Sequence, residues 1–415
     1  MHSYLLFYRC TRCSKEFGTD KLHYLCDDCS RDYTPGMPLK GVLEAVFDYE
    51  AIAKAWKEKP DPLLFSAVDP KFYPPIPVGG TAFFSPTLLQ TRCPQLRNVR
   101  IKNDGLNPSG SYKDRASQLV VADAVQKGIA EIVCASTGNA ASSLACIAAS
   151  VGKQAVIFAP KSAPPAKLIQ IQVHRATLNK VDGTYDDAFK AALDYTATHE
   201  CMCRNTGYHP LTVDGKKGAG LEIYLQNGFT VPEWIVIPVG DGVIFAGIYK
   251  AFVDLQRAGI TDRLPRLLAV QAESSDAITK YWESGVYADA FKPSTIADSI
   301  SVKTPALAHW AVMALIDTDG KAVRVSDTEI QQAQLELARY AGVFAEPSSA
   351  ATLAGLKKAI EMGWIPASAG TTNKEAGTTD KESGTTDKEA GTTNAGSIVL
   401  LITGHGLKDP SAVKL

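Results

Sequence analysis

The sequence has no apolar run that approaches the roughly 20 residues a membrane-spanning helix needs. It also has almost no net charge, because 43 basic and 44 acidic side chains leave a formal charge of -1. This balance gives no reason to expect a nucleic acid or an anionic membrane as a partner. The first residues lack a basic region and a cleavage site, so we expect no signal peptide and a cytoplasmic protein.

Cysteine is scarce, with nine residues in the chain. This odd number fits a reducing compartment better than a framework of disulfide bonds. Four of them form two Cys-x-x-Cys pairs in a short polar segment, Cys10 with Cys13 and Cys26 with Cys29. The pairs predict a zinc ribbon, because each presents two thiolates to one tetrahedral ion. The alternative is a ribbon that keeps its thiols without metal. Four thiolates would leave no open coordination position, so we expect no catalysis there.

The chain is long and apolar enough for two domains with cores of their own, with 415 residues of which 45% are hydrophobic. Residues 43–57 resemble one helix. Beyond them strands alternate with helices, which predicts parallel α/β sheets covered on both faces. We expect strands at 99–102, 132–135, 155–159, near 201, 234–238, 267–271 and 398–402, and helices at 113–128, 140–152, 166–173, 185–198, 221–226, 245–257, 327–341 and 349–362.

A tandem repeat interrupts this alternation before the last strand. It recurs at Gly370, Gly377, Gly384 and Gly391, a spacing of seven residues. No position of the repeat carries a large apolar side chain, so it is not a coiled-coil heptad. Its Gly, Thr, Lys and Glu cannot bury a core, and we expect a disordered surface insert at 367–396 with no assigned function.

The segment Asn107–Arg115 joins a strand to a helix, and Pro108 and Gly110 punctuate its backbone. It delivers Lys113 to the first turn of the helix. An amine held there can attack an aldehyde and form a Schiff base. Taken alone, a solvated surface lysine beside a helix start is the more common interpretation.

Two further loops follow strands and open helices. In Ser136-Thr137-Gly138-Asn139 the backbone N–H groups can bind an anion, and the Asn139 amide can bond a ring hydroxyl or a carboxylate. Ordinary N-capping by Ser136 or Thr137 is the alternative.

In the second loop, residues 239–243, two glycines permit close approach of the backbone to a phosphate. Asp241 is unfavourable there, so its carboxylate must point away or only the backbone contributes. The loop lacks the full dinucleotide fingerprint, which argues against a nicotinamide site.

Thr403 ends the last strand, where its hydroxyl could bond a ring nitrogen; a capped strand end is the alternative. One lysine, one phosphate loop, one anion loop and one hydroxyl together fit pyridoxal phosphate held by a Schiff base, by its phosphate and by its ring.

The motifs 107–115, 135–139, 346–350 and 403–409 resemble those of threonine synthases, which belong to the tryptophan-synthase-β type of pyridoxal-phosphate enzymes. The similarity runs from about Gly79 to Pro410 apart from the repeat, and a cysteine ribbon also occurs in threonine-synthase-like proteins. The resemblance implies a fold-type II α/β enzyme and a homodimer. It implies two doubly wound domains, a smaller mobile one at 112–214 and a large cofactor-binding one at 36–111 and 215–415, after a zinc-ribbon-like segment at 1–35.

The resemblance also implies residue roles. Lys113 would form the Schiff base and shuttle protons. Because Thr403 would place a hydroxyl rather than a carboxylate at the pyridine nitrogen, that nitrogen would stay unprotonated. Asn139 would bond the phenolic oxygen, Gly240, Asp241, Gly242, Val243 and Ile244 would cradle the phosphate, Thr403 would bond the pyridine nitrogen, and Ser136 and Thr137 would hold the substrate carboxylate or phosphate.

Several features depart from the family's pattern, among them the phosphate loop Gly240-Asp241-Gly242, which lacks the family's usual asparagine. Its members often have Asn where this chain has Thr184 and Arg where it has Lys190, and both contact the substrate phosphate there. Lysine supplies the charge without the bidentate fork. Residues 209–217 follow the family's Glu-Gly-Gln-Lys run only loosely, and Lys217 is a further expected phosphate contact.

The implied reaction converts O-phospho-L-homoserine and water to L-threonine and phosphate. One alternative is another enzyme on this scaffold, such as cysteate synthase or an amino-acid ammonia-lyase or dehydratase, which would explain Thr184 and Lys190 by a different leaving group. A second is a cofactor-binding relative without turnover, against which the intact Lys113, Asn139 and Thr403 argue.

Overall fold

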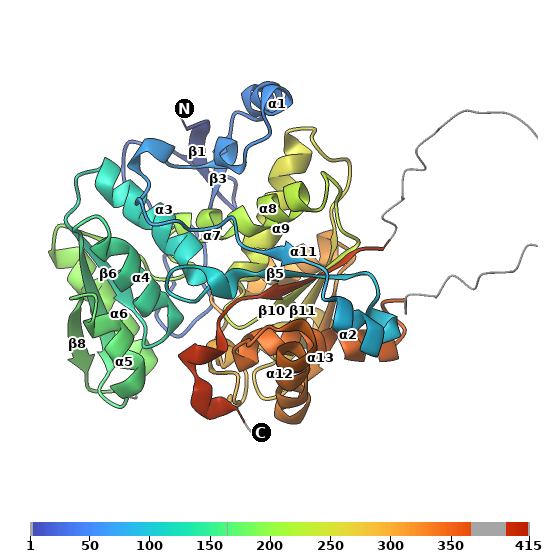
Figure 1. Cartoon of the computed structure of the whole chain (residues 1–415). Coiled ribbons are helices and arrows are strands. Elements are labelled where there is room, and N and C mark those ends of the chain that lie inside the picture. The colour runs from blue at the N-terminus through green and yellow to red at the C-terminus, as the bar shows by residue number, and fades with distance from the viewer. Residues whose placement is uncertain (1–2, 164, 367–395, 414–415) are drawn as a thin grey trace, which may run out of the picture.

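The computed structural model describes residues 3–163, 165–366 and 396–413 (Figure 1). The expected insert, apart from Gly396, lies outside the described residues. Within them the chain forms one large and one smaller parallel sheet, each with helices on both faces, and a small N-terminal sheet. No helix of the described part has the length and apolar character needed to cross a membrane.

The large sheet has the strand order β12-β11-β10-β13-β5-β4. All neighbours are parallel except the edge strand β4, which runs antiparallel to β5. The central strands β10 and β13 are buried along their whole length, as a sheet covered on both faces requires. The bounds are β4 Phe83–Phe84, β5 Val99–Asn103, β10 Trp234–Pro238, β11 Arg266–Ala272, β12 Lys321–Val325 and β13 Ile398–Ile402.

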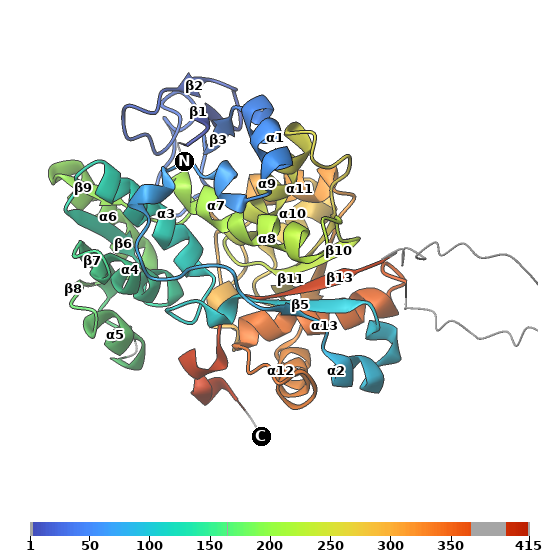
Figure 2. The ribbon, with the colours of Figure 1, turned by 45° about the horizontal axis from the view of Figure 1, so that its top comes forward.

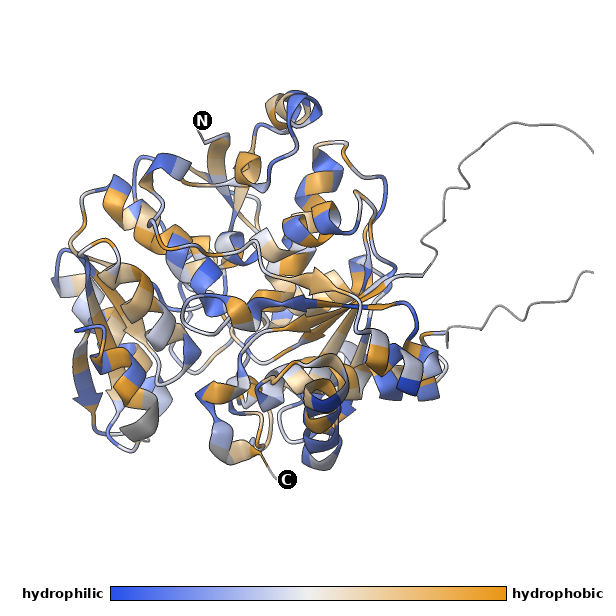
Figure 3. Cartoon of the chain, in the orientation of Figure 1, coloured by the Kyte–Doolittle hydropathy of each residue, from blue (hydrophilic) through white to orange (hydrophobic). Residues whose placement is uncertain are grey.

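Helices cover both faces of the large sheet, and apolar residues concentrate on the strands and on the helix sides that face them (Figures 1 and 3). One face carries α12 and α13, with α2 beside α12. The other carries α9 and α11, with α8 packed on α9 (Figure 2). The bounds are α2 Thr87–Arg92, α8 Gly218–Gln226, α9 Val243–Arg257, α10 Ala277–Ser284, α11 Ala308–Asp317, α12 Asp327–Ala341 and α13 Pro347–Glu361.

The smaller sheet has the order β8-β7-β6-β9, and all its described pairs are parallel. Helices α3, α4 and α5 lie on one side and α6 on the other, while α7 packs between α3 and α9. The division of the chain into domains at 112 and 214 stays a prediction. The bounds are α3 Lys113–Gln126, β6 Glu131–Ala135, α4 Asn139–Ala149, β7 Gln154–Pro160, α5 Pro165–Gln172, β8 Thr177–Val181, α6 Tyr185–Thr198, β9 Cys201–Cys203 and α7 Leu211–Lys216.

The helix expected at 43–57 is wrong in its first part. Leu43–Phe47 is strand β3, which pairs antiparallel with β1 (Leu5–Cys10), and β1 also pairs with β2 (Glu16–Phe17). Helix α1 (Tyr49–Glu58) begins only after Asp48, whose side chain accepts the Ala51 N–H. A five-residue strand followed directly by a helix offers too short an alternation to separate the two periods by sequence.

The N-terminal part of the chain, up to Leu39, contacts the smaller sheet and the loop before α11. The Tyr24 hydroxyl accepts the backbone N–H of Cys203 at 2.9 Å, and its ring stacks on Tyr208. The backbone N–H of Leu39 donates to the carbonyl of Ala306 at 2.9 Å. The segment is therefore fastened to β9 and to the start of α11 at once.

A buried ion network fixes the start of α3. Arg115 donates to both carboxylate oxygens of Asp104 and of Glu222. Lys102 donates to Glu222 at 2.5 Å and to the Thr81 carbonyl at 2.9 Å. Burial alone would raise the pKa of Glu222, but Arg115 and Lys102 outweigh it and lower the pKa to about 2. The network ties β5 and α8 to the helix that begins at the reactive-lysine candidate.

We expect Glu222→Gln to lower the free energy of unfolding at pH 7 by about 3 kcal/mol. The fold lowers the pKa of Glu222 to about 2 from its unfolded value of about 4.3, and each pKa unit corresponds to about 1.4 kcal/mol. A carboxyl group with a lowered folded-state pKa stabilises the fold above its unfolded pKa of about 4.3. The difference between the two proteins in urea denaturation should therefore shrink between about pH 5 and pH 2.

The control is Glu283→Gln, which removes a carboxylate partner of Arg324. The Glu283 side chain is 47% exposed. Solvent screens that pair, so its loss should cost less. Equal losses in the two variants, or a difference that does not change with pH, would contradict the prediction.

Candidate active site

Four loops meet where parallel strands end. β5 leads into the lysine loop, β6 into α4, β10 into α9 and β13 into Thr403. Open α/β sheets bind ligands at this edge. A narrow cavity lies among the loops, at the edge where the parallel strands end. It is lined by Lys113, Asn139, Pro238, Val239, Gly240, Asp241, Gly242, Ile244, Phe245, Ser299, Ile300, Glu346, Ser348 and Thr403.

The lysine loop is held against the end of β13. The Tyr112 N–H donates to the Thr403 carbonyl at 2.8 Å, and the His405 N–H donates to the Gly110 carbonyl at 2.9 Å. Within the loop, the backbone N–H of Ser109 donates to Asp114 at 2.7 Å and its hydroxyl donates at 2.5 Å. These bonds place Lys113, the first residue of α3, beside Thr403.

Thr403 is itself positioned by Ser349, near the start of α13. The Ser349 hydroxyl oxygen accepts the N–H groups of Thr403 at 2.9 Å and of Gly404 at 2.8 Å. The two hydroxyl oxygens lie 3.1 Å apart. The Thr403 side chain is therefore fixed at the wall of the cavity.

Asn139 meets a carboxylate to which the sequence analysis gave no role. Its amide nitrogen lies 3.1 and 3.3 Å from the oxygens of Glu346 and 3.2 Å from the hydroxyl of Ser299. Ser348 donates to the same carboxylate at 2.7 Å. Glu346 belongs to the motif at residues 346–350. An acidic side chain directly before the proline that begins α13 is the sequence signal that could have identified it. Ser299 carried none, because the fold brings it from a distant loop.

The loop after β10 has the form of a phosphate cradle. Gly242 adopts φ +82°, which favours glycine, and ends the loop at the start of α9. The first turn of α9 leaves backbone N–H groups without helical acceptors. Asp241 accepts the Val243 N–H at 2.9 Å, so one carboxylate oxygen is bonded to its own loop. Burial alone would raise the pKa of Asp241, but Lys216 and Lys113 outweigh it and lower the pKa.

These residues fit pyridoxal phosphate, the cofactor that the sequence resemblance implies. An amine (Lys113), an amide (Asn139), a hydroxyl (Thr403) and a helix-start loop (239–244) line one cavity. They offer the covalent, ring and phosphate contacts that this cofactor needs.

A second, polar cavity adjoins the first and shares Asn139, Ser299, Glu346 and Ser348 with it. Its other lining residues include Thr137, at the start of α4, and Lys408. The Lys408 amine donates to the Ser109 carbonyl at 2.8 Å, to Ser142 at 3.2 Å and to Gln170 at 2.7 Å. Burial lowers the pKa of Lys408.

The other predicted substrate contacts lie elsewhere. Thr184 is exposed and caps α6 by accepting the Asp187 N–H, while Lys190 pairs with Asp194 at 2.6 Å on the surface. Lys217 is buried between Asp214 at 2.6 Å and Asp254 at 3.1 Å. Ser136 accepts the Gly138 N–H at 3.2 Å and does not line either cavity. Of the five predicted substrate contacts, Thr137 alone is among the lining residues, and the assignments of the others stay predictions.

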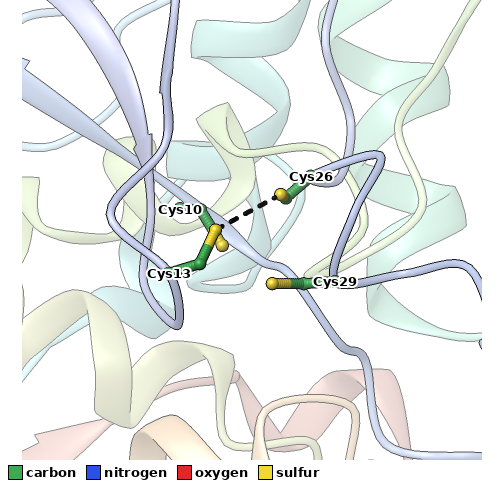
Figure 4. Close-up of side chains that lie close together, drawn as sticks. All are labelled: Cys10, Cys13, Cys26 and Cys29. Carbon is green, nitrogen blue, oxygen red and sulfur yellow. Dashed lines mark hydrogen bonds between the residues drawn. The ribbon is translucent and has the colours of Figure 1, made fainter.

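The four N-terminal cysteines come together at one point (Figure 4). Their sulfur atoms all lie within 4.8 Å of one another, and those of Cys13 and Cys26 are 3.7 Å apart. Tetrahedral zinc with bonds of about 2.3 Å separates thiolate sulfurs by about 3.8 Å. The cluster therefore fits one zinc ion with four thiolate ligands.

Comparison with known proteins supports the same conclusions. A family model described as pyridoxal-phosphate dependent enzyme matches residues 79–371. Threonine synthase from Methanosarcina acetivorans is 31% identical over 98% of this chain and 93% of its own length. Threonine synthase from Methanocaldococcus jannaschii is 30% identical over 97% of this chain and 93% of its own length.

Among solved structures, a fungal L-serine ammonia-lyase from Rhizomucor miehei superposes with a TM-score of 0.62. It is 21% identical and covers 79% of this chain and 94% of that one. At this identity the likeness shows the fold, and it confirms the predicted fold class.

We expect the purified protein to contain about one zinc ion per chain by elemental analysis, because four clustered thiolates complete a structural zinc site. Cys13→Ser should lose most of the zinc and melt at a lower temperature. Cys93→Ser, a cysteine outside the cluster, should keep its zinc. A metal-free protein whose melting temperature does not respond to added zinc would contradict the assignment.

Proposed function

This chain belongs to the family of pyridoxal-phosphate-dependent enzymes and, within it, to the threonine synthases, and we propose that it converts O-phospho-L-homoserine and water to L-threonine and phosphate. The similarity to threonine synthases over nearly the whole chain carries this proposal. The cavity that gathers Lys113, Asn139, Thr403 and the loop after β10 supports it independently.

Lys113 is the proposed catalytic residue. Its amine would hold the cofactor through the cofactor's aldehyde group and would serve as the base that removes the α-proton of a bound substrate. Bound pyridoxal phosphate supplies an electron sink for the negative charge that then develops. The same amine can return a proton later, because the bonds of the lysine loop to β13 keep it at the cavity wall.

The remaining groups orient the reactants. The Thr403 hydroxyl, fixed by Ser349, would bond the ring nitrogen, and Asn139 would bond the phenolic oxygen. Glu346 holds the Asn139 amide in the cavity. Backbone N–H groups of the loop from Gly240 to Ile244 would bind the cofactor phosphate.

The substrate would occupy the second cavity, next to the cofactor site. Thr137, before α4, lines this cavity and would hold the substrate carboxylate. Lys408 is the cation among the described lining residues and would supply positive charge for the substrate phosphate, against the carboxylates of Asp298, Glu346 and Asp409 that line the same cavity. Its amine donates to three neutral acceptors. Thr184 and Lys190 would contact the substrate only if the start of α6 closes over the cavity.

The proposal also includes a cellular location and an oligomeric state. The balanced charge and the cysteine content support a cytoplasmic location. The resemblance to fold-type II enzymes supports a homodimer.

The decisive experiment measures phosphate release and threonine formation from O-phospho-L-homoserine by the purified protein. We expect equal amounts of both products, and a loss of about 100-fold or more in Lys113→Ala, because proton transfer by a positioned base contributes that much. Lys71→Ala, which removes a surface amine outside both cavities and without any predicted role, is the matched control and should remain active.

A wild-type protein that binds the cofactor but yields no threonine would overturn the substrate while leaving the cofactor site intact. Phosphoserine with sulfite, and hydroxy and diamino acids, would then be the substrates to test. Equal activity of Lys113→Ala and wild type would overturn the role of Lys113.

A further inference from the structure

The loop that would hold the cofactor phosphate contains an acidic residue, Asp241. A carboxylate repels a phosphate dianion, and the repulsion grows in a buried site of low dielectric. The backbone N–H groups at the start of α9 offset part of this repulsion. Two further basic side chains, Lys216 and Arg204, lie close enough to Asp241 to influence it electrostatically.

Lys216 is a fully buried lysine whose amine lacks an acceptor. It is the last residue of α7, its relative exposure is 0%, and no hydrogen-bond partner for its Nζ exists among the described residues. The backbone carbonyl of Lys216 accepts a hydrogen bond from the Tyr112 hydroxyl at 2.6 Å. Tyr112 directly precedes Lys113. An ammonium buried without an acceptor is costly to the fold, and a bound anion would remove that cost.

The contact with α9 fixes where the Lys216 stem starts. A Cβ placed on Gly247 would lie only 2.8 Å from the Lys216 Cβ, so glycine there permits the close approach. Gly247 lies about one helical turn, or roughly 5.4 Å, from Val243 at the helix start. The four-carbon stem of a lysine can span that length.

The Lys216 amine and the Asp241 carboxylate influence each other electrostatically. Burial lowers the pKa of Lys216, and Asp241 is the charge that opposes this most strongly. Conversely, Lys216 is the foremost cation among those that lower the pKa of Asp241. The Lys216 amine and the phosphate loop are therefore close enough for their charges to interact, although no ion pair between Lys216 and Asp241 forms within 4.0 Å among the described residues.

Arg204 adds a second positive charge at the end of β9. It is fully buried, and its Nη2 atom has no acceptor in the described part of the chain. Its other groups are held, with Nε donating to Ser117 at 3.2 Å and Nη1 donating to Thr206 at 2.5 Å. Its charge also acts on both Lys216 and Asp241.

We propose that Lys216 binds the cofactor phosphate directly and, with Arg204 behind it, balances the negative charge of Asp241. The inference rests on the cofactor site of the proposed function, but not on its substrate. Lys216 then completes a cradle of which the other half is the start of α9.

The test compares pyridoxal phosphate with pyridoxal, which lacks the phosphate. The apoprotein is titrated with each compound, and binding is followed by the absorbance of the ligand. In Lys216→Gln, affinity for pyridoxal phosphate should fall by about 10–100-fold, as for loss of a hydrogen bond to a charged group. Affinity for pyridoxal should change by less than about threefold, a small fraction of that loss.

Lys217→Gln is the matched control. Lys217 is the next residue and is equally buried, but its amine is held by Asp214 and Asp254. Its loss should lower the melting temperature while leaving the ratio of the two affinities unchanged. An equal fall for both compounds in Lys216→Gln, or no fall for either, would overturn the proposal and leave Lys216 a structural residue.

Asp241→Asn is an independent arm that does not depend on the folding of a lysine variant. Asparagine can still accept the Val243 N–H, but it removes the charge. The preference for pyridoxal phosphate over pyridoxal should rise severalfold, and the same change should restore part of the loss in Lys216→Gln. An unchanged preference would contradict the charge balance.

These outcomes are separate from those of the enzyme assay. A wild-type protein that binds neither compound refutes the cofactor site and with it both proposals. A protein that binds both compounds and shows the expected ratio, yet forms no threonine, refutes the substrate alone.

Discussion

The bonding of the lysine loop to the end of β13 is the constraint on which the site depends. Two backbone hydrogen bonds join Tyr112 to Thr403 and Gly110 to His405. Lys408 adds a bond to the Ser109 carbonyl across 299 residues of chain. Without these bonds the amine of Lys113 and the hydroxyl of Thr403 would belong to separate loops. With them, the groups proposed for the two ends of the cofactor ring move as one body.

Much of the fold could be predicted because most segments carry one clear period. The buried strands β10 and β13 and the capped helix α12 are of this kind. The strands β8 and β12 were not expected. Both are edge strands with exposed or half-exposed polar residues, so they lack the apolar run that marks a central strand.

For the site residues, what mattered was whether the local sequence alone could identify them. Lys113 and Asn139 could be found because each begins a helix after a strand and a loop, and Thr403 because it directly follows the last strand. All of this is local information. Ser299 and Lys216 could not, because their importance arises from what the fold places beside them. Lys216 looked like one of two adjacent lysines, and only burial separates it from Lys217, whose charge two carboxylates neutralise.

The direction of β13 has a consequence for how this sequence can evolve. The tandem repeat enters the chain ahead of Ile398, at the amino end of the strand, whereas the cavity lies beyond Ile402 at the carboxyl end. Gain or loss of whole repeat units by copying errors would change the length of the connection from α13 without altering strand register. Because closure entropy grows only with the logarithm of length, such variation is nearly neutral for folding. Natural populations could therefore differ in repeat number while sharing one catalytic geometry.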